Sequence, residues 1–491
     1  MKITLISFDS ELFCVGLRLL SSCLKQKNHE VNCLFLSWDA YAKNKSCKFQ
    51  IRYTEKLLNN IGELCRDSDL IGMSLMTNQF MQAVQVTEYL KKSRLKAPII
   101  WGGIEPTVEP KTCLEYADIV CLGEGEETLL ELVEKMEKGN SFRETKNIWL
   151  KSGKEIICNP VRPLVENINA FPLPDYSCQD HYLANADRIE PLTRERIIKF
   201  KGERFRSSGG KVRYPIMTSR GCPFICSYCC NSVYERLYVK QKRLRFRSAE
   251  NVISELEMIR EQLGPLDFVY MVDDNFTARS SEDLNNFCEL YKQKIGVSFY
   301  CQVSPLTINE EKINILIKYG CVKVTMGVET GSERIAVMYN RGNFHKVTNN
   351  AIALLEKYRK KMRLPPSYQF IIDNPYETLD ETVQTLKLAL SIKKPWDSPI
   401  FSLMLFPGTP LYEKALVDGF IKDKYSQIYG KNWLNQSKPF FQLWIRLYRK
   451  NYPVTLLRIL LHPWVLLLMT NNLANAVWKT RIFRCLWNRP E

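Results

Sequence analysis

Histidine is scarce in this chain, and its one tight group of cysteines has no second group beside it. Four histidines occur in 491 residues, and none lies near Cys222, Cys226 and Cys229. A structural zinc site needs four nitrogen or sulfur ligands, commonly supplied by two C-x2-C pairs. Because those partners are missing, zinc at these cysteines stays an alternative that the spacing disfavours.

The amino terminus lacks the apolar core of a secretory signal peptide. Residues 1–6, MKITLI, have the pattern of a strand instead. The chain has 17 cysteines, an odd number, and many stand singly at apolar positions such as Cys33, Cys121, Cys301 and Cys321. Such positions are typical of buried free thiols and not of a disulfide framework. We therefore predict a cytoplasmic protein with reduced cysteines.

Acidic residues are nearly absent from the end of the chain. Residues 431–491 hold ten Lys or Arg and a single acid, Glu491, so this tail carries more than half of the net charge of +16. A basic chain can bind nucleic acid, but the location of the charge matters more than its sum. Because the rest of the chain is only mildly basic, we do not expect a nucleic-acid partner.

The same tail is rich in tryptophan, with five of the nine in the chain. Its uncharged stretch from Ile459 to Trp478 has 20 residues, which is near the length that spans a bilayer, but His462 and Pro463 interrupt it. Basic, aromatic and apolar residues together suit a segment that lies on an anionic membrane. Helices packed over the active site and a membrane span are the alternatives. An interfacial tail would suit a lipid-soluble substrate.

The first 135 residues alternate strand-like apolar runs with helical stretches. The alternation predicts an α/β fold with a doubly wound parallel sheet, which binds ligands at the carboxyl ends of its strands. Two of these ends carry glycine-containing loops, residues 101–107 (WGGIEPT) and 123–128 (GEGEET), where the backbone can approach a ligand closely. Tight turns between strand and helix are the alternative explanation for these glycines. The predicted strands are 3–7, 31–36, 70–76, 98–103 and 118–123.

A second alternation begins at about residue 211. Six strand-like runs alternate with helices, which is consistent with a partial (β/α) barrel. The helix predicted at 249–263 has one apolar stripe, and another opens with a capping-box pattern from Thr378 to Glu381. Residues 151–210 lack a clear period and are predicted to connect the two domains. The strands predicted in this second part are 215–219, 268–272, 298–303, 322–329, 368–372 and 401–405.

The cysteine run carries the most specific signal. Cys222, Cys226 and Cys229 can bind three irons of a 4Fe-4S cubane and leave the fourth iron open. A bacterial ferredoxin run has closer cysteines and supplies a fourth. The spacing C-x3-C-x2-C, with the aromatic Tyr228 before the last cysteine, resembles the radical S-adenosylmethionine (SAM) superfamily instead. Cys230 directly follows Cys229 and is predicted not to bind the cluster.

This resemblance implies that SAM binds the open iron and is cleaved to a 5′-deoxyadenosyl radical, with no acid-base work by the protein at that step. It also implies that Asp273 binds the SAM amino group, that Glu329 contacts the ribose or amino-acid part, and that Tyr228 lies near the adenine. Carboxylates that cap turns and, for Tyr228, core packing are the alternatives. Asp373-Asn374 replaces the glycine that the superfamily usually has after a late strand, so no SAM contact is assigned there.

The loops 74–77, 101–107 and 123–128 lie where three predicted strands end. They resemble loops of the cobalamin-binding domain that precedes many radical SAM domains, and this likeness covers residues 1 to about 150. The motif Asp-x-His-x-x-Gly of some such domains is absent, which implies that cobalamin binds without a histidine ligand to cobalt. The implied cobalamin contacts are Ser74, Thr77, Gly102, Gly103, Gly123 and Gly125.

The two resemblances together imply a cobalamin-binding domain at 1–150, a connector at 151–210, a radical SAM partial (β/α)6 barrel at 211–425 and a mainly helical extension at 426–491. The implied cofactors are a 4Fe-4S cluster, SAM and cobalamin, with a cytosolic electron donor and, through residues 431–491, peripheral membrane contact.

The resemblances also imply the reaction. We expect methylation of an unactivated carbon in a small or lipid-like substrate, in which one SAM methylates cobalamin and a second supplies the radical. A cyclase or rearrangement enzyme that uses cobalamin as a redox partner is one alternative. A non-catalytic cobalamin or iron-sulfur carrier is the other.

Overall fold

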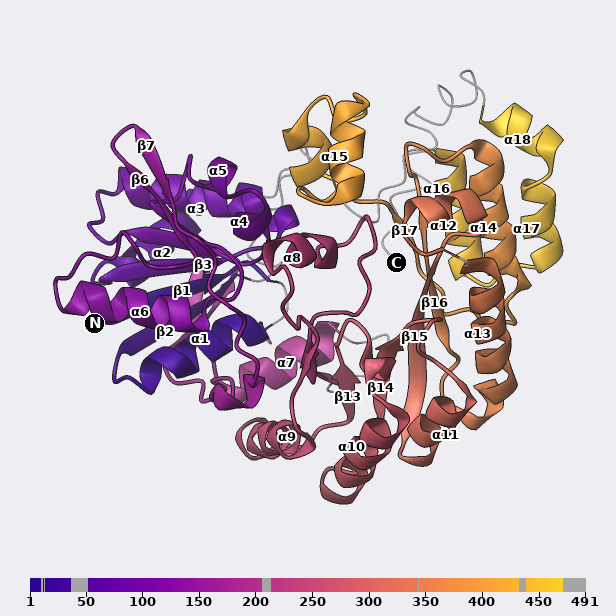
Figure 1. Cartoon of the computed structure of the whole chain (residues 1–491), viewed down its shortest axis with the longest axis horizontal. Helices are drawn as coiled ribbons and strands as arrows, with labels where there is room; N and C mark the ends of the chain where they lie inside the picture. Colours follow the sequence, from indigo (N-terminus) through magenta and orange to yellow (C-terminus); the bar gives the residue numbers. More distant parts are fainter. Residues whose placement is uncertain are drawn as a thin grey trace. The chain divides into compact units, whose positions relative to one another are not determined.

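The computed structural model describes residues 1–9, 12, 14–36, 52–204, 213–342, 344–431 and 439–470. The chain folds into two compact units, and each unit is assembled from separate stretches of sequence (Figure 1). The first unit consists of Met1–Asp273, Glu289–Ser298 and Leu405–Lys431. The second consists of Asp274–Cys288, Phe299–Met404 and Asn432–Glu491.

The first unit is built on a nine-stranded sheet with the order β7-β6-β5-β4-β3-β1-β2-β8-β9. The strands from β5 to β8 in this order pair in parallel, as the alternation in the sequence predicts. Nearly every residue of β1 and β2 is shielded from solvent, because helices cover both faces of a parallel sheet. The predicted strands are confirmed as β1 (Lys2–Ser7), β2 (Glu30–Leu36), β3 (Leu70–Ser74), β4 (Ile99–Gly102) and β5 (Ile119–Cys121).

Amphipathic helices alternate with these strands. The helix α2 shows the local cause, because the Thr54 hydroxyl accepts a hydrogen bond from the Leu57 amide (3.2 Å) and so caps the helix, which buries Leu57, Leu58 and Ile61. The helices of this part are α1 (Val15–Lys25), α2 (Glu55–Cys65), α3 (Phe80–Lys92), α4 (Ile104–Val108), α5 (Pro110–Cys113), α6 (Glu126–Glu137) and α7 (Arg194–Arg204), with a 3₁₀ turn η2 (Thr77–Gln79).

The expected connector contains regular structure that its lack of a period does not predict. Antiparallel strands β6 (Ile148–Ser152) and β7 (Glu155–Cys158) extend one edge of the first sheet. At the other edge, β8 (His181–Asn185) pairs with β2, and β9 (Arg188–Pro191) pairs with β8. The expected connector therefore contributes strands at both edges of the first sheet, within residues 148–158 and 181–191, and is not only a link between domains.

The rest of the first unit holds the cysteine run. Strand β10 (Arg213–Ile216) pairs in parallel with β13 (Phe268–Met271), and the short β11 (Ser219–Arg220) pairs antiparallel with β12 (Arg245–Phe246). The predicted apolar stripe of one helix is confirmed, since Val252, Leu256, Ile259 and Leu263 are all buried. The helices here are α8 (Asn231–Leu237), α9 (Ala249–Leu263) and α15 (Pro410–Val417), with a π-helical turn η7 (Tyr425–Tyr429).

The second unit contains four parallel strands that pair in chain order, β14 (Phe299–Val303), β15 (Cys321–Glu329), β16 (Ser367–Ile372) and β17 (Ile400–Ser402). With β10 and β13, they account for the six strands predicted after residue 211. The predicted capping box is confirmed at α14, where Thr378 and Glu381 satisfy each other's backbone amides. The helices around these strands are α10 (Ser281–Lys294), α11 (Glu310–Lys318), α12 (Glu333–Met338), α13 (Phe344–Tyr358) and α14 (Leu379–Ser391).

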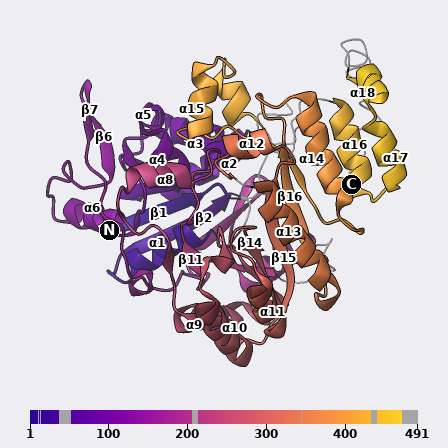
Figure 2. The ribbon, with the colours of Figure 1, turned by 45° about the vertical axis from the view of Figure 1, so that its right-hand side comes forward.

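In the carboxyl-terminal part of the second unit, the described residues 439–470 are mainly helical, as predicted. Helix α16 (Pro439–Arg449) buries Trp444 and Tyr448, and α17 (Val454–Leu460) and α18 (Pro463–Met469) follow it at the edge of the unit in both views (Figure 1, Figure 2). In the described part of the chain, no helix has the length and apolar character needed to cross a bilayer. The last eight residues of the predicted uncharged stretch, 471–478, lie outside the described residues.

Candidate cofactor-binding site

The three predicted cluster cysteines lie on one loop between β11 and α8. Cys222, Cys226 and Cys229 are half-buried thiols, and a hydrogen bond from the Cys229 amide to the Cys226 carbonyl (3.0 Å) makes a turn between two of them. The Asn231 side-chain amide donates to the Cys229 sulfur (3.6 Å). Cys230 is at the N-cap position of α8, where its carbonyl accepts from the amides of the first helical turn.

This donor set fits an iron-sulfur cluster. Thiolates bind the separate irons of a cubane, so three thiols can serve without converging on one point. Among the described residues, no three His, Cys, Asp or Glu side chains converge on a site for a single metal ion. Hydrogen bonds to cluster sulfur, such as the one from Asn231, tune a cluster's reduction potential.

Asp273, the predicted SAM ligand, follows β13 and is fully buried. Its carboxylate accepts hydrogen bonds from the Thr218 amide (2.7 Å) and hydroxyl (2.7 Å) and from the Ser219 amide (2.5 Å) and hydroxyl (2.9 Å). Thr218 and Ser219 directly precede the cysteine loop. These bonds give Asp273 a structural role at the start of that loop, and a contact with SAM stays a prediction.

Glu329, the second predicted SAM ligand, ends β15 in the second unit. It is buried, has a positive φ of 68°, and forms an ion pair with Arg341 (3.5 Å). A side chain at Gly327 would come within 2.2 Å of the Glu329 carboxylate, so this glycine makes the space for it. A non-glycine residue held in the left-handed region is a strained feature that is common at ligand sites. Its contact with SAM also stays a prediction.

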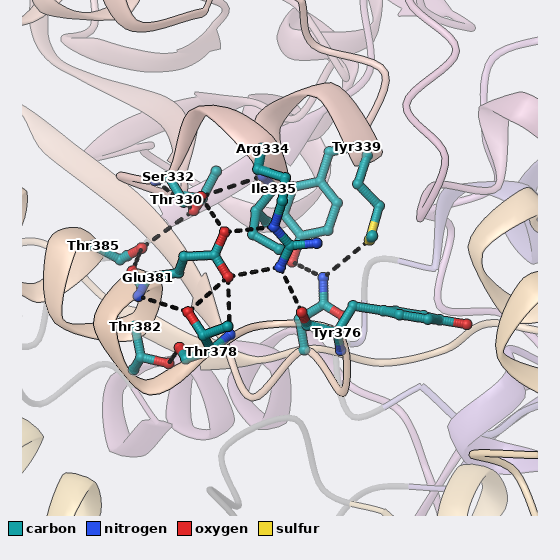
Figure 3. A network of polar contacts seen from close by, with 12 residues as sticks. Thr330, Ser332, Arg334, Ile335, Tyr339, Tyr376, Thr378, Glu381, Thr382 and Thr385 are labelled. Carbon is teal, nitrogen blue, oxygen red and sulfur yellow. Dashed lines mark hydrogen bonds and ion pairs between the residues drawn. The ribbon is translucent and has the colours of Figure 1, made fainter. Parts of the chain in front are cut away.

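A polar network holds the loop that follows Glu329 (Figure 3). The Glu381 carboxylate accepts from the Ser332 hydroxyl (2.8 Å) and from two nitrogens of Arg334 (2.8 and 2.6 Å), and it also closes the cap of α14. Hydrogen bonds from Arg334 lower the pKa of Glu381 to about 2. The carboxylate is therefore charged at neutral pH and fixes Ser332 at the start of α12.

Tyr228 and Asp373 are two further positions that the sequence singles out. Tyr228 is half-buried within the cysteine loop, and its place near adenine stays a prediction. Asp373 has a φ of 65°, which is the left-handed conformation that glycine adopts easily. Asp and Asn tolerate this region better than most residues. Asp373 thus keeps a glycine-like backbone where the superfamily's usual glycine is missing.

The predicted cobalamin glycines differ in what surrounds them. A Cβ at Gly103 (φ 101°) would lie 2.7 Å from the Leu75 carbonyl, and a Cβ at Gly123 (φ 67°) would lie 1.8 Å from the Tyr238 hydroxyl. At Gly103 and Gly123, the group that approaches the glycine backbone closely is therefore another part of the protein. Cβ atoms at Gly102 and Gly125 would make only ordinary contacts. The predicted cobalamin contacts of all four glycines remain predictions.

Two buried polar side chains lie near the ends of β3 and β4. Thr77 and Glu105 are almost completely buried, and apart from their interaction with each other the Thr77 hydroxyl and the Glu105 Oε2 atom have no hydrogen-bond partner. Burial raises the pKa of Glu105. Ser74, at the end of β3, is half-buried. Buried polar groups with spare hydrogen-bonding capacity at the carboxyl ends of parallel strands fit a polar ligand such as cobalamin.

An ion network that the sequence does not predict joins the loop after β5 to the cysteine loop. Arg220 and Arg245 are directly opposite on β11 and β12, and both contact Glu124, at 3.0 and 2.5 Å. Arg220 also contacts Glu126 (2.5 Å). Burial opposes ionisation of Glu124, but hydrogen bonds from Arg245 and Arg220 outweigh it and lower its pKa. Glu124, Glu126 and Arg220 lie in or beside loops that sequence motifs single out. No sequence pattern, however, predicts that these residues form ion pairs with one another.

Comparisons with known proteins agree with this architecture. The profile of the Radical SAM superfamily matches residues 216–389, and that of the B12 binding domain matches residues 1–133. A protein of Pyrococcus horikoshii named uncharacterized methyltransferase PH0819 is 27% identical over 359 residues, which cover 72% of this chain and 71% of that protein. The anaerobic magnesium-protoporphyrin IX monomethyl ester cyclase of Cereibacter sphaeroides is 24% identical, with 76% of this chain and only 57% of the cyclase covered.

Among solved structures, the chain is similar to the radical SAM methyltransferase TsrM of Kitasatospora setae, determined with cobalamin and a 4Fe-4S cluster. The TM-score is 0.63, the identity is 15%, and the match covers 85% of this chain and 75% of TsrM. At this identity the likeness shows the fold.

Fold and family profiles together define an α/β protein with an amino-terminal B12-binding domain, a radical SAM half-barrel of parallel strands and a helical carboxyl-terminal region. The chain combines a B12-binding domain with a radical SAM domain, and its relatives include methyltransferases and cyclases. It is a radical SAM enzyme, and its cofactors are a 4Fe-4S cluster, SAM and cobalamin.

Proposed function

We propose that this enzyme methylates an unactivated carbon of a small or lipid-like substrate. The observation that supports the proposal is the ion network in the first unit, in which Arg220, beside the cysteine loop, pairs with Glu124 and Glu126 of the B12-binding domain. Carbon methylation with two cofactors requires both cofactors to reach one substrate. The loops that bind them must therefore be held at fixed positions relative to each other. When bound, the cluster supplies the electron that cleaves SAM, and cobalamin supplies the methyl group.

The residues of the chain have separate tasks in this proposal. Cys222, Cys226 and Cys229 hold the cluster, and the buried carboxylate of Asp273 fixes the start of their loop through four hydrogen bonds. Glu329 presents a buried carboxylate to the amino-acid or ribose part of SAM. Preorganised groups of this kind bind a ligand without having to reorganise.

Two alternatives have different support. A ring-forming reaction with cobalamin as a redox partner is favoured by the likeness to the cyclase of Cereibacter sphaeroides, whose full length the chain does not match. A non-catalytic carrier of cobalamin or of an iron-sulfur cluster would not need a buried, strained Glu329 at a strand end. We therefore rank methylation first and the cyclase second.

We also propose a substrate class and an electron donor. The cyclase among the relatives is named for a porphyrin ester, a large and mostly apolar molecule, so a lipid-like substrate fits this chain. The cluster must be reduced in each cycle, and we propose a cytosolic reductant for a protein of cytoplasmic location.

The helices α17 and α18 support membrane contact by the predicted tail. Trp464 is 71% exposed, Leu467 64% and Leu468 66%, and Ile459 is exposed as well. No Asp or Glu occurs between residues 424 and 490, and the exposed Arg458 lies beside the apolar residues. An apolar surface with tryptophan and cations suits the interface of an anionic bilayer. We propose that the enzyme binds such a membrane peripherally through this surface.

Anaerobic reconstitution tests the proposed reaction. The protein is loaded with iron, sulfide and hydroxocobalamin and incubated with a reductant and SAM that carries a deuterated methyl group. Methylation predicts release of 5′-deoxyadenosine and a product that has gained the labelled methyl group. A product that has lost hydrogen and gained no label would favour the cyclase, and absence of SAM cleavage would favour the carrier.

A further inference from the structure

Residues 405–431, here called the strap, belong to the first unit although the chain on either side of them belongs to the second. The strap follows β17 and contains α15 and the π-helical turn η7. It contacts two other parts of the first unit, the cysteine loop with α8 and the B12-binding domain.

One end of the strap is fixed to the cysteine loop. The Leu411 amide donates to the carbonyl of Ser227 (2.9 Å), which lies between two of the predicted cluster cysteines. Arg236 of α8 donates to the Gly408 carbonyl. Gly408 has a φ of 73°, and a Cβ there would lie 3.6 Å from Val233 of α8 and 3.3 Å from Val108 of α4. The strap thus touches the cysteine side and the B12-binding domain at a single glycine.

The other end is fixed to the B12-binding domain. The Tyr429 hydroxyl donates to Glu105 (2.7 Å), and the Tyr429 ring stacks on Phe80 with 4.1 Å between centroids. Lys424 forms an ion pair with Glu109 (2.7 Å). Aromatic stacking and a buried hydrogen bond to a carboxyl group each stabilise the contact between this end and the domain. This end of the strap is therefore held at a defined position on the B12-binding domain.

Two buried polar side chains lie at this end of the strap. Tyr429 bonds the buried Glu105 carboxyl, which also interacts with the Thr77 hydroxyl. Thr77 is one of the predicted cobalamin contacts. Tyr429 thus fixes the orientation of a buried carboxyl group at the strand ends where cobalamin is expected.

We infer that the strap positions the cysteine loop relative to the cobalamin-binding strand ends, and that Tyr429 and Glu105 are its positioning residues. The inference rests on the proposed roles of the cysteine loop and of the B12-binding domain. Breaking the bond between Tyr429 and Glu105 should loosen the strap, weaken its bond to Ser227 and expose the cluster cysteines. Local opening of this kind is measurable without any cofactor.

Thiol alkylation of the iron-free, full-length protein tests the inference. We expect Tyr429→Phe and Glu105→Ala to raise the iodoacetamide reaction rates of Cys226 and Cys229 about fivefold relative to the exposed Cys158, because one buried hydrogen bond is lost. Glu105→Gln should stay near the wild-type rate, since its amide oxygen can still accept from Tyr429.

Ser426→Ala is the matched control, because it removes an exposed hydroxyl from the same π-helical turn without touching Glu105. Unchanged rates at Cys226 and Cys229 in both disruptive variants would overturn the inference. A rise shared by the buried Cys33 and Cys65 would mark general unfolding and would also count against it. Hydroxocobalamin titration of the wild type is read separately, since failure to bind would contradict the proposed function and not the strap.

Discussion

Gly123 shows how one residue can couple two parts of the first unit. Its missing side chain lets the Tyr238 hydroxyl reach the loop after β5, where it lies 3.3 Å from the Glu124 amide. Glu124 in turn holds Arg220 and Arg245 at the base of the cysteine loop. Gly123 is therefore needed for a contact between two segments of the protein, independently of any role in cobalamin binding.

Gly123→Ala should lower stability by about 2–3 kcal/mol, because alanine must adopt a positive φ and displace Tyr238. Gly125→Ala is the control two residues away, where a Cβ meets nothing closer than 3.7 Å. Thermal unfolding of both variants measures the difference. Adding Tyr238→Phe to Gly123→Ala should recover part of the loss, and equal melting temperatures for the two single variants would refute this account of Gly123.

Local patterns in the sequence predict the features whose cause lies within a few residues. The cysteine spacing, the capping box of α14 and the apolar stripe of α9 are of this kind. The pairing of Arg220 with Glu126 is not, because 94 residues separate them. Tyr429 and Glu105 are 324 residues apart, so no local signal could join them.

At the scale of elements, the strands β6 to β9 show the same limit. They are short, and their partly exposed residues give no continuous apolar run. Their pairing is fixed by tertiary contacts, such as the buried hydrogen bond from Ser21 of α1 to Asp175 (2.8 Å), just before β8. By contrast, the buried central strands of both units consist mainly of apolar residues and can be predicted from sequence alone.

The network at the start of α14 gives a prediction with a defined pH dependence. The pKa of Glu381 is about 2 in the folded protein against an ordinary value of 4.5, so its charged form stabilises the fold above about pH 4.5. That contribution is lost as the pH falls toward 2. Glu381→Gln should therefore destabilise the second unit by about 1–3 kcal/mol at pH 7.

Urea unfolding at several pH values measures this effect. The difference between wild type and Glu381→Gln should shrink steadily from pH 4.5 downward. The control Asp380→Asn, at an exposed position in the same helical turn, should be nearly neutral throughout. A difference that stays constant down to pH 2.5 would show that the charge of Glu381 is not the cause.

At the scale of the whole molecule, the tail divides into two kinds of helix. The predicted alternatives for it were an interfacial segment, packed helices and a membrane span. Helix α16 is packed, since Trp444 donates to the Leu457 carbonyl (3.0 Å) and Tyr448 stacks on Trp396 at 4.5 Å. Helices α17 and α18 leave apolar side chains exposed instead, and the proposed membrane contact depends on them.

Co-sedimentation of the full chain with vesicles tests this contact. We expect binding to vesicles that contain phosphatidylserine and little binding to pure phosphatidylcholine. Leu467→Ser combined with Leu468→Ser should weaken binding at least about tenfold, because two large apolar side chains no longer enter the interface. The matched control, Leu416→Ser with Val417→Ser, changes two exposed apolar residues of α15. Equal loss in both, or no binding at all, would contradict the proposal.

The central claim is that three cysteines leave one iron of a cluster open to SAM. Its most direct test is 5′-deoxyadenosine formation by the anaerobically reconstituted protein, compared with a Cys226→Ala variant. We predict cleavage of SAM by the wild type and at least about a thousandfold less by Cys226→Ala, with cobalamin binding preserved. Equal cleavage by the two proteins, or a wild-type cluster whose spectrum does not change when SAM is added, would contradict the account.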